Sequence, residues 1–468
     1  MPPSIAVLVF VLGIAGLFYL NRDSSARTSK ALWLPVIWLW IHGSRSVAAW
    51  LGISVRDDSP IDQVLGGILL LLGVIVLARR KHVFRLLKYN WPIALYFFYS
   101  LVSIAWADFP GHGTKRWFKA LGDLVMVLVL VTDIQPAEAL KRFFSRVGFI
   151  LIPVSVLLLR YFPNLGHGYD LSGRQTNTGV TTDKNMLGVV TLVLALGAFW
   201  QILELLRDSK RLHRSRQLLA QAVLLYFGIT LLFAAHSATS GACFILGSGM
   251  MVATSRPIFR NRPMAVHAFV FVILLVGVLT VLLGGQGAAA EAIGRDAHFH
   301  GRTEVWELLV TMSPDPILGA GFENFWFGPR LERIWYVFPL TNEAHDGYLE
   351  VYLNLGLLGL GLIVLILTQG YLKAVAAFRR DPALGNLLVA IILTAAIYSI
   401  TEAGFRMLDP IWIVLLLSIL TAGRMALTYK ESFPSGQEPA SPLSVMRGRF
   451  PRPRTSVDRQ LETKPILK

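Results

Sequence analysis

Long apolar runs separated by short polar connections dominate this sequence. Runs such as 64–78, 187–205 and 266–283 carry few or no charges and approach the roughly 20 residues that a helix needs to cross a bilayer. Because lipid offers no hydrogen-bond partner to an open backbone, runs this apolar are expected to be helices. The first twenty residues lack a basic start and a small-residue cleavage pattern, so we interpret them as the first membrane helix and not as a signal peptide.

The pattern predicts an all-α, polytopic integral membrane protein with about 12–13 transmembrane helices. They are expected near residues 3–20, 31–43, 61–78, 90–106, 117–133, 147–162, 184–205, 218–235, 241–255, 264–284, 347–370, 384–401 and 410–425.

Charge along the chain predicts how these helices are oriented. Of the 44 Lys and Arg residues, 31 lie in alternate connections and in the segment from Arg424 onward. The positive-inside rule places this richer set in the cytoplasm, with the C-terminus, and places the N-terminus outside. The net charge of +15 is then a consequence of topology, and no nucleic-acid binding is predicted.

Two regions differ from the rest of the chain. We expect one membrane-embedded domain over 1–428 and a disordered, basic cytoplasmic tail over 429–468, rich in Pro, Ser and Arg, that rests on the lipid bilayer. Within the domain, 285–345 is the longest polar connection and is rich in aromatic residues. We expect this outer loop to be partly helical, with a short helix at 303–312, and to fold back onto the bilayer surface. An ordinary aromatic belt is the alternative.

Several outer residues have the chemistry to bind a diphosphate. Arg116 and Lys184 are expected near helix starts, and Arg174 and Asn185 lie in the same outer connections. Arginine presents a planar fork to phosphate oxygens, and a helix start adds free N–H groups. The alternative for each cation is that it only extends to the lipid headgroups. For Arg302 a functional role is favoured, because it precedes Trp306 at i,i+4 spacing in the aromatic loop.

His345 is the best candidate for acid–base chemistry. It titrates near neutral pH, at the junction of the outer loop and a helix, and Glu343 and Asp346 flank it. A structural histidine is the alternative interpretation. No metal site and no cofactor are predicted, because Cys243 is the single cysteine and no HExxH motif is present.

Five segments resemble, in order, parts of the O-antigen ligase and exopolysaccharide polymerase superfamily: SIAWADFPGHGTKRW, GVTTDKNMLG, GRTEVW, PILGAGFENFW and NEAHDGYLEVYLNLGLLGLGL. Together they run from about residue 100 to 367. The chain departs from the pattern at Asp183 and Asp346, and at Ala238 and Thr239, where many members carry other polar or basic residues.

The resemblance implies a glycosyltransferase of the bacterial inner membrane. Such enzymes move a glycan from undecaprenyl diphosphate to a hydroxyl of lipid A–core or of another glycan, on the periplasmic side, with inversion and without a metal. Carried over, the family's roles make His345 the general base and place diphosphate contacts on Arg302 and Arg116. Lys184, Asn185, Arg174, Glu343 and Trp306 complete the predicted substrate-binding set.

Ligase and polymerase both remain open, as do two rival readings. A peptidoglycan polymerase of the shape and division family would need a key Asp in the outer loop. A transporter or flippase for a lipid-linked saccharide would need charged residues at mid-bilayer and matched broken helices.

Overall fold

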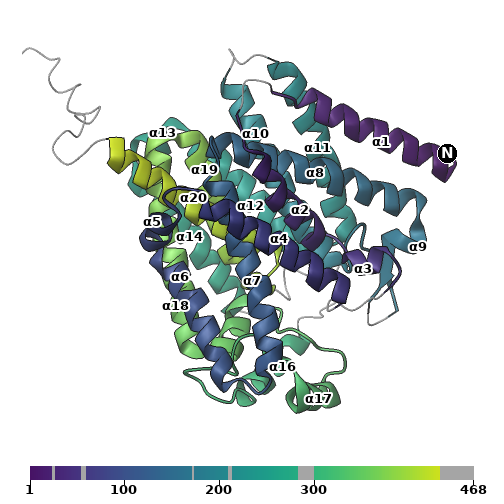
Figure 1. Ribbon diagram of the computed structural model, residues 1–468, viewed down its shortest axis with the longest axis vertical. Helices are drawn as coiled ribbons and strands as arrows, with labels where there is room; N and C mark the ends of the chain where they lie inside the picture. Colours follow the sequence, from purple (N-terminus) through teal and green to yellow (C-terminus); the bar gives the residue numbers. More distant parts are fainter. Residues whose placement is uncertain (24–26, 54–58, 171–172, 209–212, 283–299, 433–468) are drawn as a thin grey trace, which may run out of the picture. The chain divides into compact units, whose positions relative to one another are not determined.

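The computed structural model describes residues 1–23, 27–53, 59–170, 173–208, 213–282 and 300–432. Regular structure in these residues is almost entirely helical (Figure 1). The exception is one short antiparallel pair, β1 (His167–Tyr169) with β2 (Gln175–Asn177). The predicted all-α class is confirmed.

The described helices mostly follow the predicted apolar runs. They are α1 (Pro3–Leu20), η1 (Lys30–Leu32), α2 (Trp33–His42), α3 (Val47–Trp50), α4 (Pro60–Ala78), α5 (Val83–Tyr89), α6 (Trp91–Val102), η2 (Ser103–Trp106), α7 (Pro110–Val131), α8 (Pro136–Tyr161), α9 (Pro163–Gly166), α10 (Lys184–Arg207), α11 (Arg214–Ala235), α12 (Ala238–Thr254), α13 (Pro257–Asn261), α14 (Pro263–Leu282), α16 (His300–Thr311), α17 (Gly328–Val337), α18 (Gly347–Arg380), α19 (Pro382–Tyr398) and α20 (Pro410–Ser432).

Many of these helices have the length and composition of membrane spans. Among the described residues, seven are long and apolar enough to cross a bilayer, and four further apolar helices are shorter. α1 and α4 bury only 11% of their apolar windows, whereas α10 and α20 bury 78%. The apolar surface of α1 and α4 therefore fits contact with lipid, and α10 and α20 form part of the protein core.

Two helices begin earlier than the sequence predicted. α7 begins at Pro110 instead of near 117, and α8 begins at Pro136 instead of near 147. Proline suits the first turn of a helix because its missing N–H would have no partner there. The first turns of both helices are polar, so an apolar pattern alone does not reveal them.

The segment from 300 to 346, which the charge pattern predicts to lie outside and which is called the outer segment below, has a small core of its own. The short helix predicted at 303–312 is present as α16, while α17 was not predicted. Phe325 is fully buried in a cluster with residues of α16, α17 and α18, whereas Tyr336 is 91% exposed. The aromatic residues of this segment thus serve both internal packing and its surface. Residues 283–299, the first part of the predicted loop, lie outside the described residues.

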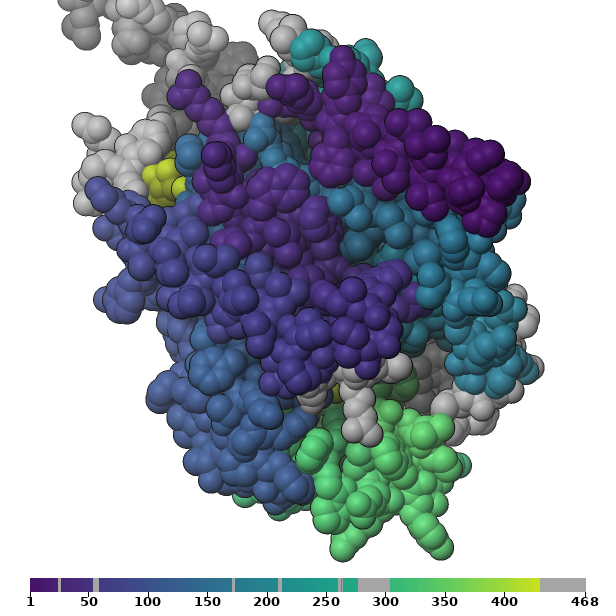
Figure 2. All heavy atoms as spheres, turned by 45° about the vertical axis from the view of Figure 1, so that its right-hand side comes forward, coloured from purple at the N-terminus to yellow at the C-terminus, as the bar shows by residue number. Residues whose placement is uncertain are grey.

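The outer segment lies beside the first half of α7. Figure 1 shows α16 and α17 near the end where α7 begins, and Figure 2 shows the green surface of the outer segment next to the blue surface of the chain near residue 100. The Asn324 side chain accepts a hydrogen bond from the Phe109 backbone N–H at 2.9 Å. These contacts fix the outer segment against the helix that carries Arg116.

The chain divides into two compact units, Met1–Ala426 and Leu427–Lys468. Most of the second unit, including residues 433–468 of the predicted tail, lies outside the described residues.

Candidate active site

A pocket of about 530 Å³ brings together residues from distant parts of the sequence. Its lining comes from the ends of α2 and α4, the first half of α7, the start of α10, the segment before α18 and the connection between α19 and α20. All of these belong to connections, or adjoining helix ends, that the charge pattern predicted to lie outside. The pocket therefore collects the polar groups of one predicted face.

The lining of this pocket is chemically two-sided. Four cations line it, Lys115, Arg116, Lys119 and Arg406, together with five carboxylates, Asp62, Asp183, Glu343, Glu402 and Asp409. Apolar residues of α4, among them Leu65, Leu69 and Leu70, line another part. The three cations on α7, called the cationic region below, lie in the same pocket as the apolar part of α4, a combination that suits an amphiphile with an anionic head.

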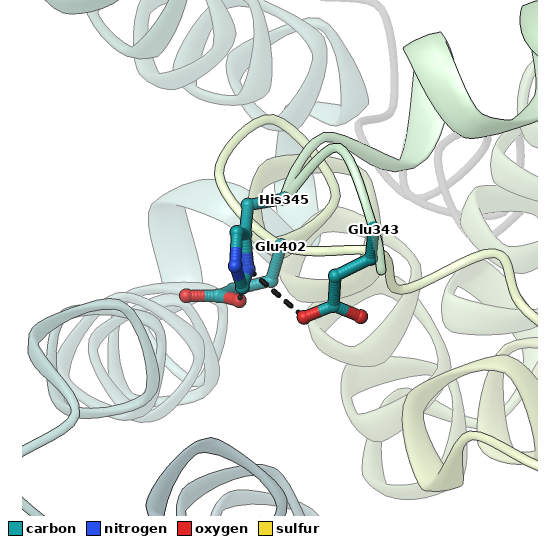
Figure 3. Close-up of side chains that lie close together, drawn as sticks. All are labelled: Glu343, His345 and Glu402. Atoms are coloured by element: carbon teal, nitrogen blue, oxygen red, sulfur yellow. Dashed lines mark hydrogen bonds and ion pairs between the residues drawn. The ribbon is translucent and has the colours of Figure 1, made fainter. Parts of the chain in front are cut away.

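Three side chains converge at the start of α18 (Figure 3). The His345 Nδ1 lies 2.9 Å from Glu343 Oε1 and 3.3 Å from Glu402 Oε2. Glu343 and His345 come from the outer segment, and Glu402 comes from the connection between α19 and α20. Both carboxylates line the pocket. Because Nδ1 faces these carboxylates, Nε2 is the ring nitrogen left to act as a base.

Two side chains hold the backbone of Ala344, the residue before His345. The Trp306 Nε1 donates to the Ala344 carbonyl at 2.8 Å, and the Ala344 N–H donates to Glu350 at 2.6 Å. His345 itself adopts a φ of +50°, a left-handed conformation that costs a non-glycine residue about 1–2 kcal/mol. Such a conformation persists only where the surrounding contacts determine it.

Asp346 has a structural role at this position. Its carboxylate accepts hydrogen bonds from the Tyr348 and Leu349 N–H groups at 2.8 and 2.9 Å, which caps α18. The sequence placed Asp346 beside Glu343 as a possible partner of His345. In the structure Glu402 occupies that role instead.

The two carboxylates determine the charge of His345. Burial lowers the pKa of His345, but the hydrogen bonds and negative charges of Glu343 and Glu402 outweigh this effect and raise the pKa to about 10. The imidazolium form is therefore favoured at neutral pH, and the neutral base becomes more abundant as pH rises.

Ion pairs connect His345 to the cationic region of the pocket. Arg116 Nη1 lies 3.2 Å from Glu323 Oε2, and Arg406 Nε lies 3.8 Å from the same oxygen. Arg406 Nη1 also lies 3.7 Å from Glu343 Oε2. Alternating charges thus run from Arg116 through Glu323, Arg406 and Glu343 to His345.

Glu343, His345 and Glu402 are also close enough together to hold a metal ion. Their ligand atoms lie within 4.8 Å of one another. The guanidinium of Arg406 beside Glu343 already places a positive charge at this point, which disfavours a second cation. The prediction that no metal is needed stays a prediction, with a chelator as its test.

Arg116 lines the pocket, but it does not lie at the start of a helix as the sequence predicted. It follows Pro110, the first residue of α7, by six positions, so the free N–H groups of that helix are too far along the chain to serve a ligand at Arg116. Its guanidinium is engaged by Glu323, and its buried Nε has no hydrogen-bond partner among the described residues.

The start of α10 differs from its predicted role. Lys184 is the first residue of α10, as expected, but the Asp183 carboxylate accepts the Asn185 and Met186 N–H groups at 2.9 Å each. The protein's own anion therefore occupies the site where a helix start would bind phosphate. Asn185 lines the pocket, whereas Lys184 does not.

Two further predicted residues lie apart from the pocket lining. Arg174 is exposed in the turn between β1 and β2, where its N–H donates to Asp170 at 2.9 Å. Trp306 lies in α16 and supports the backbone of Ala344. The backbone of Arg302 falls in the first turn of α16, and its side chain lies outside the described residues.

Three residues of the site were not predicted from the sequence: Glu402, Arg406 and Glu323. Glu402 and Arg406 lie in TEAGFRMLDP, a short polar connection between two apolar runs on the predicted outer side. This concentration of charge was the available signal. Glu323 lies in the aromatic loop, and only the fold shows that it contacts Arg116.

The comparisons with known proteins give one family. No curated protein shows a significant match to the chain. Residues 222–364 match the family model of the O-antigen ligases. That range includes α16, α17, the His345 segment and the first half of α18. On this match, residues 222–364 are similar to an O-antigen ligase domain, which supports the resemblance to the O-antigen ligase and polymerase superfamily.

Proposed function

We propose that this protein transfers a glycan from undecaprenyl diphosphate to an acceptor hydroxyl on the periplasmic face of the inner membrane. The family match supports glycan transfer of the O-antigen ligase or polymerase type. The two-sided pocket supports a lipid-diphosphate donor, because its cations suit the diphosphate and its α4 wall suits the lipid.

The observation that carries this proposal is the contact of His345 with Glu343 and Glu402, two carboxylates that line the pocket, although His345 itself is not among the lining residues. The same pocket contains Arg116, the proposed partner of the diphosphate, with Lys115 and Lys119 on the same helix. A base held by carboxylates, next to cations that stabilise a leaving anion, is the arrangement that transfer to a hydroxyl requires.

In the proposed reaction the acceptor oxygen attacks the anomeric carbon of the donor sugar. A new glycosidic C–O bond forms as the bond from that carbon to the diphosphate oxygen breaks. The acceptor proton passes to Nε2 of His345, and the diphosphate departs with the electrons of the broken bond. Direct displacement of this kind inverts the anomeric centre.

Arg116 is proposed to stabilise the departing diphosphate, together with Arg302. Stabilisation of developing charge by one positioned donor is typically worth about 3–4 kcal/mol. Glu343 and Glu402, by contrast, reduce the fraction of His345 that is neutral and able to act as a base, because they favour its protonated form. Transfer is therefore expected to accelerate as pH rises and neutral His345 becomes more abundant.

Purified protein in detergent provides the test. We expect it to convert lipid-diphosphate-linked glycan and a glycan or lipid A–core acceptor into product, with excess chelator present. Detergent removes the two compartments that a flippase needs, so a protein that only moves the donor across a bilayer would form no product. The proposal would be contradicted if product formed with neither of the two acceptors. Activity that is lost in chelator and restored by a divalent cation would contradict its metal-free form.

A further inference from the structure

Arg406 occupies a central position between the two parts of the site. It lies 3.8 Å from Glu323, which also binds Arg116, and 3.7 Å from Glu343, which also binds His345. Both distances exceed hydrogen-bond length, so these contacts are electrostatic. The guanidinium of Arg406 therefore faces two carboxylates. One is paired with Arg116, which is proposed to bind the diphosphate, and the other is paired with His345, the proposed base.

The connection that carries Arg406 is firmly held. The Leu408 N–H donates to Asp123 at 2.8 Å, and the fully buried Asp123 also accepts from Trp38 at 2.8 Å. At its other end the Ser399 carbonyl accepts the Gly347 N–H at 2.7 Å, directly beside the start of α18. The 399–409 connection is thus fixed both to α7 and to the segment of His345.

Glu323 is equally well fixed on its own segment. The neighbouring Phe322 N–H donates to Ser103 at 3.0 Å, and the Asn324 side chain accepts from Phe109 at 2.9 Å. Glu323 has a φ of +55°, which directs the chain between these two anchors. The two carboxylates that Arg406 faces are therefore held by separate parts of the backbone.

We propose that Arg406 is a positioning residue for glycan transfer: it holds Glu323 and Glu343 so that Arg116 and His345 face the donor with a fixed separation and orientation. This inference rests on the proposed function. Arg406 acts through the two carboxylates and takes no part in bond making or proton transfer. Without it, two carboxylates lose the cation between them and are expected to move apart from their working positions.

Kinetics can separate this role from direct binding of the donor. The test uses Arg406→Gln in the purified transfer assay, with Arg330→Gln as the matched control. Arg330 pairs with Asp108 at 2.9 Å in the same outer region but does not line the pocket. For Arg406→Gln we expect kcat to fall about tenfold or more while the KM for donor changes less than about twofold, since positioning affects the reaction step. Arg330→Gln should retain normal kcat and KM.

Two further variants complete the test. Arg406→Lys should recover only part of kcat, because one ammonium does not reach two separate carboxylates as a guanidinium does. It also serves as the readout if Arg406→Gln fails to fold. Adding Glu323→Gln to Arg406→Gln should lower kcat by less than the product of the two single effects, as expected for residues in one network.

The outcomes distinguish the two levels of proposal. A raised KM with normal kcat would show direct donor binding and overturn the positioning role, as would fully independent effects of Glu323→Gln and Arg406→Gln. If the wild-type protein transfers glycan and Arg406→Gln keeps normal kcat and KM, as expected for Arg330→Gln, only the role of Arg406 is overturned. No transfer by the wild-type protein would overturn the proposed function and this inference with it.

Discussion

The starts of α10 and α18 are built in the same way and yet differ in chemistry. Each follows an aspartate whose carboxylate caps the helix: Asp183 accepts two backbone N–H groups, and so does Asp346. Each also has an adjacent basic side chain, Lys184 or His345, on the predicted outer face. In the sequence the two sites look equivalent.

The difference lies in what packs against them. The connection between α19 and α20 reaches the start of α18 and brings Glu402 to His345. Neither Lys184 nor His345 is itself in the pocket lining, but His345 contacts Glu343 and Glu402, which are. The comparison indicates that a charged helix start becomes a reactive site only when a distant segment supplies the partner that tunes it.

The largest expected contrast is in catalysis. His345→Ala should reduce the transfer rate about 10²–10⁴-fold, the usual loss for a positioned base. Lys184→Ala should change the rate by about twofold or less, because Lys184 does not line the pocket and, among the described residues, forms no ion pair with a carboxylate that does. Product formation by the purified variants measures both. Near-normal transfer by His345→Ala would remove His345 as the base and direct attention to Glu343 and Glu402.

Loss of the caps should separate structure from function. Asp183→Ala and Asp346→Ala should each lower the free energy of unfolding by about 1 kcal/mol, because each removes a helix N-cap. Only Asp346→Ala should also slow transfer appreciably, since it disturbs the residue next to His345. Thermal unfolding in detergent and the transfer assay measure these effects, with Asp183→Asn and Asp346→Asn as cap-preserving controls. Equal loss of transfer in the two Ala variants would contradict the distinction.

The smallest effect concerns stability and pH. The pKa of His345 is raised above its unfolded value near 6.5, so the stabilisation from Glu343 and Glu402 is fully present below about pH 6.5 and is lost as pH rises through about 10. The melting temperature of the wild-type protein should therefore decrease more across this window than that of His345→Gln. Parallel curves for the two proteins would show that His345 gains no such stabilisation.

The apolar pattern predicted most of the membrane helices because each had to satisfy its backbone inside lipid. It missed the polar first turns of α7 and α8 and the whole of α17, whose apolar side faces a small local core. For the site, His345 and Glu343 were predicted as neighbours and are in contact. The partners Glu402 and Arg406 were not, because sequence spacing carries no information on which connection packs against α18.

The most direct test of the central claim is the pH dependence of transfer, measured with excess chelator for the wild-type protein and for Glu402→Gln. If His345 is the base and its carboxylate neighbours raise its pKa, the wild-type rate should rise through the alkaline range. Removing one carboxylate charge should move that rise to lower pH. The account would be contradicted by a wild-type rate that falls as pH rises, or by an unchanged midpoint in Glu402→Gln.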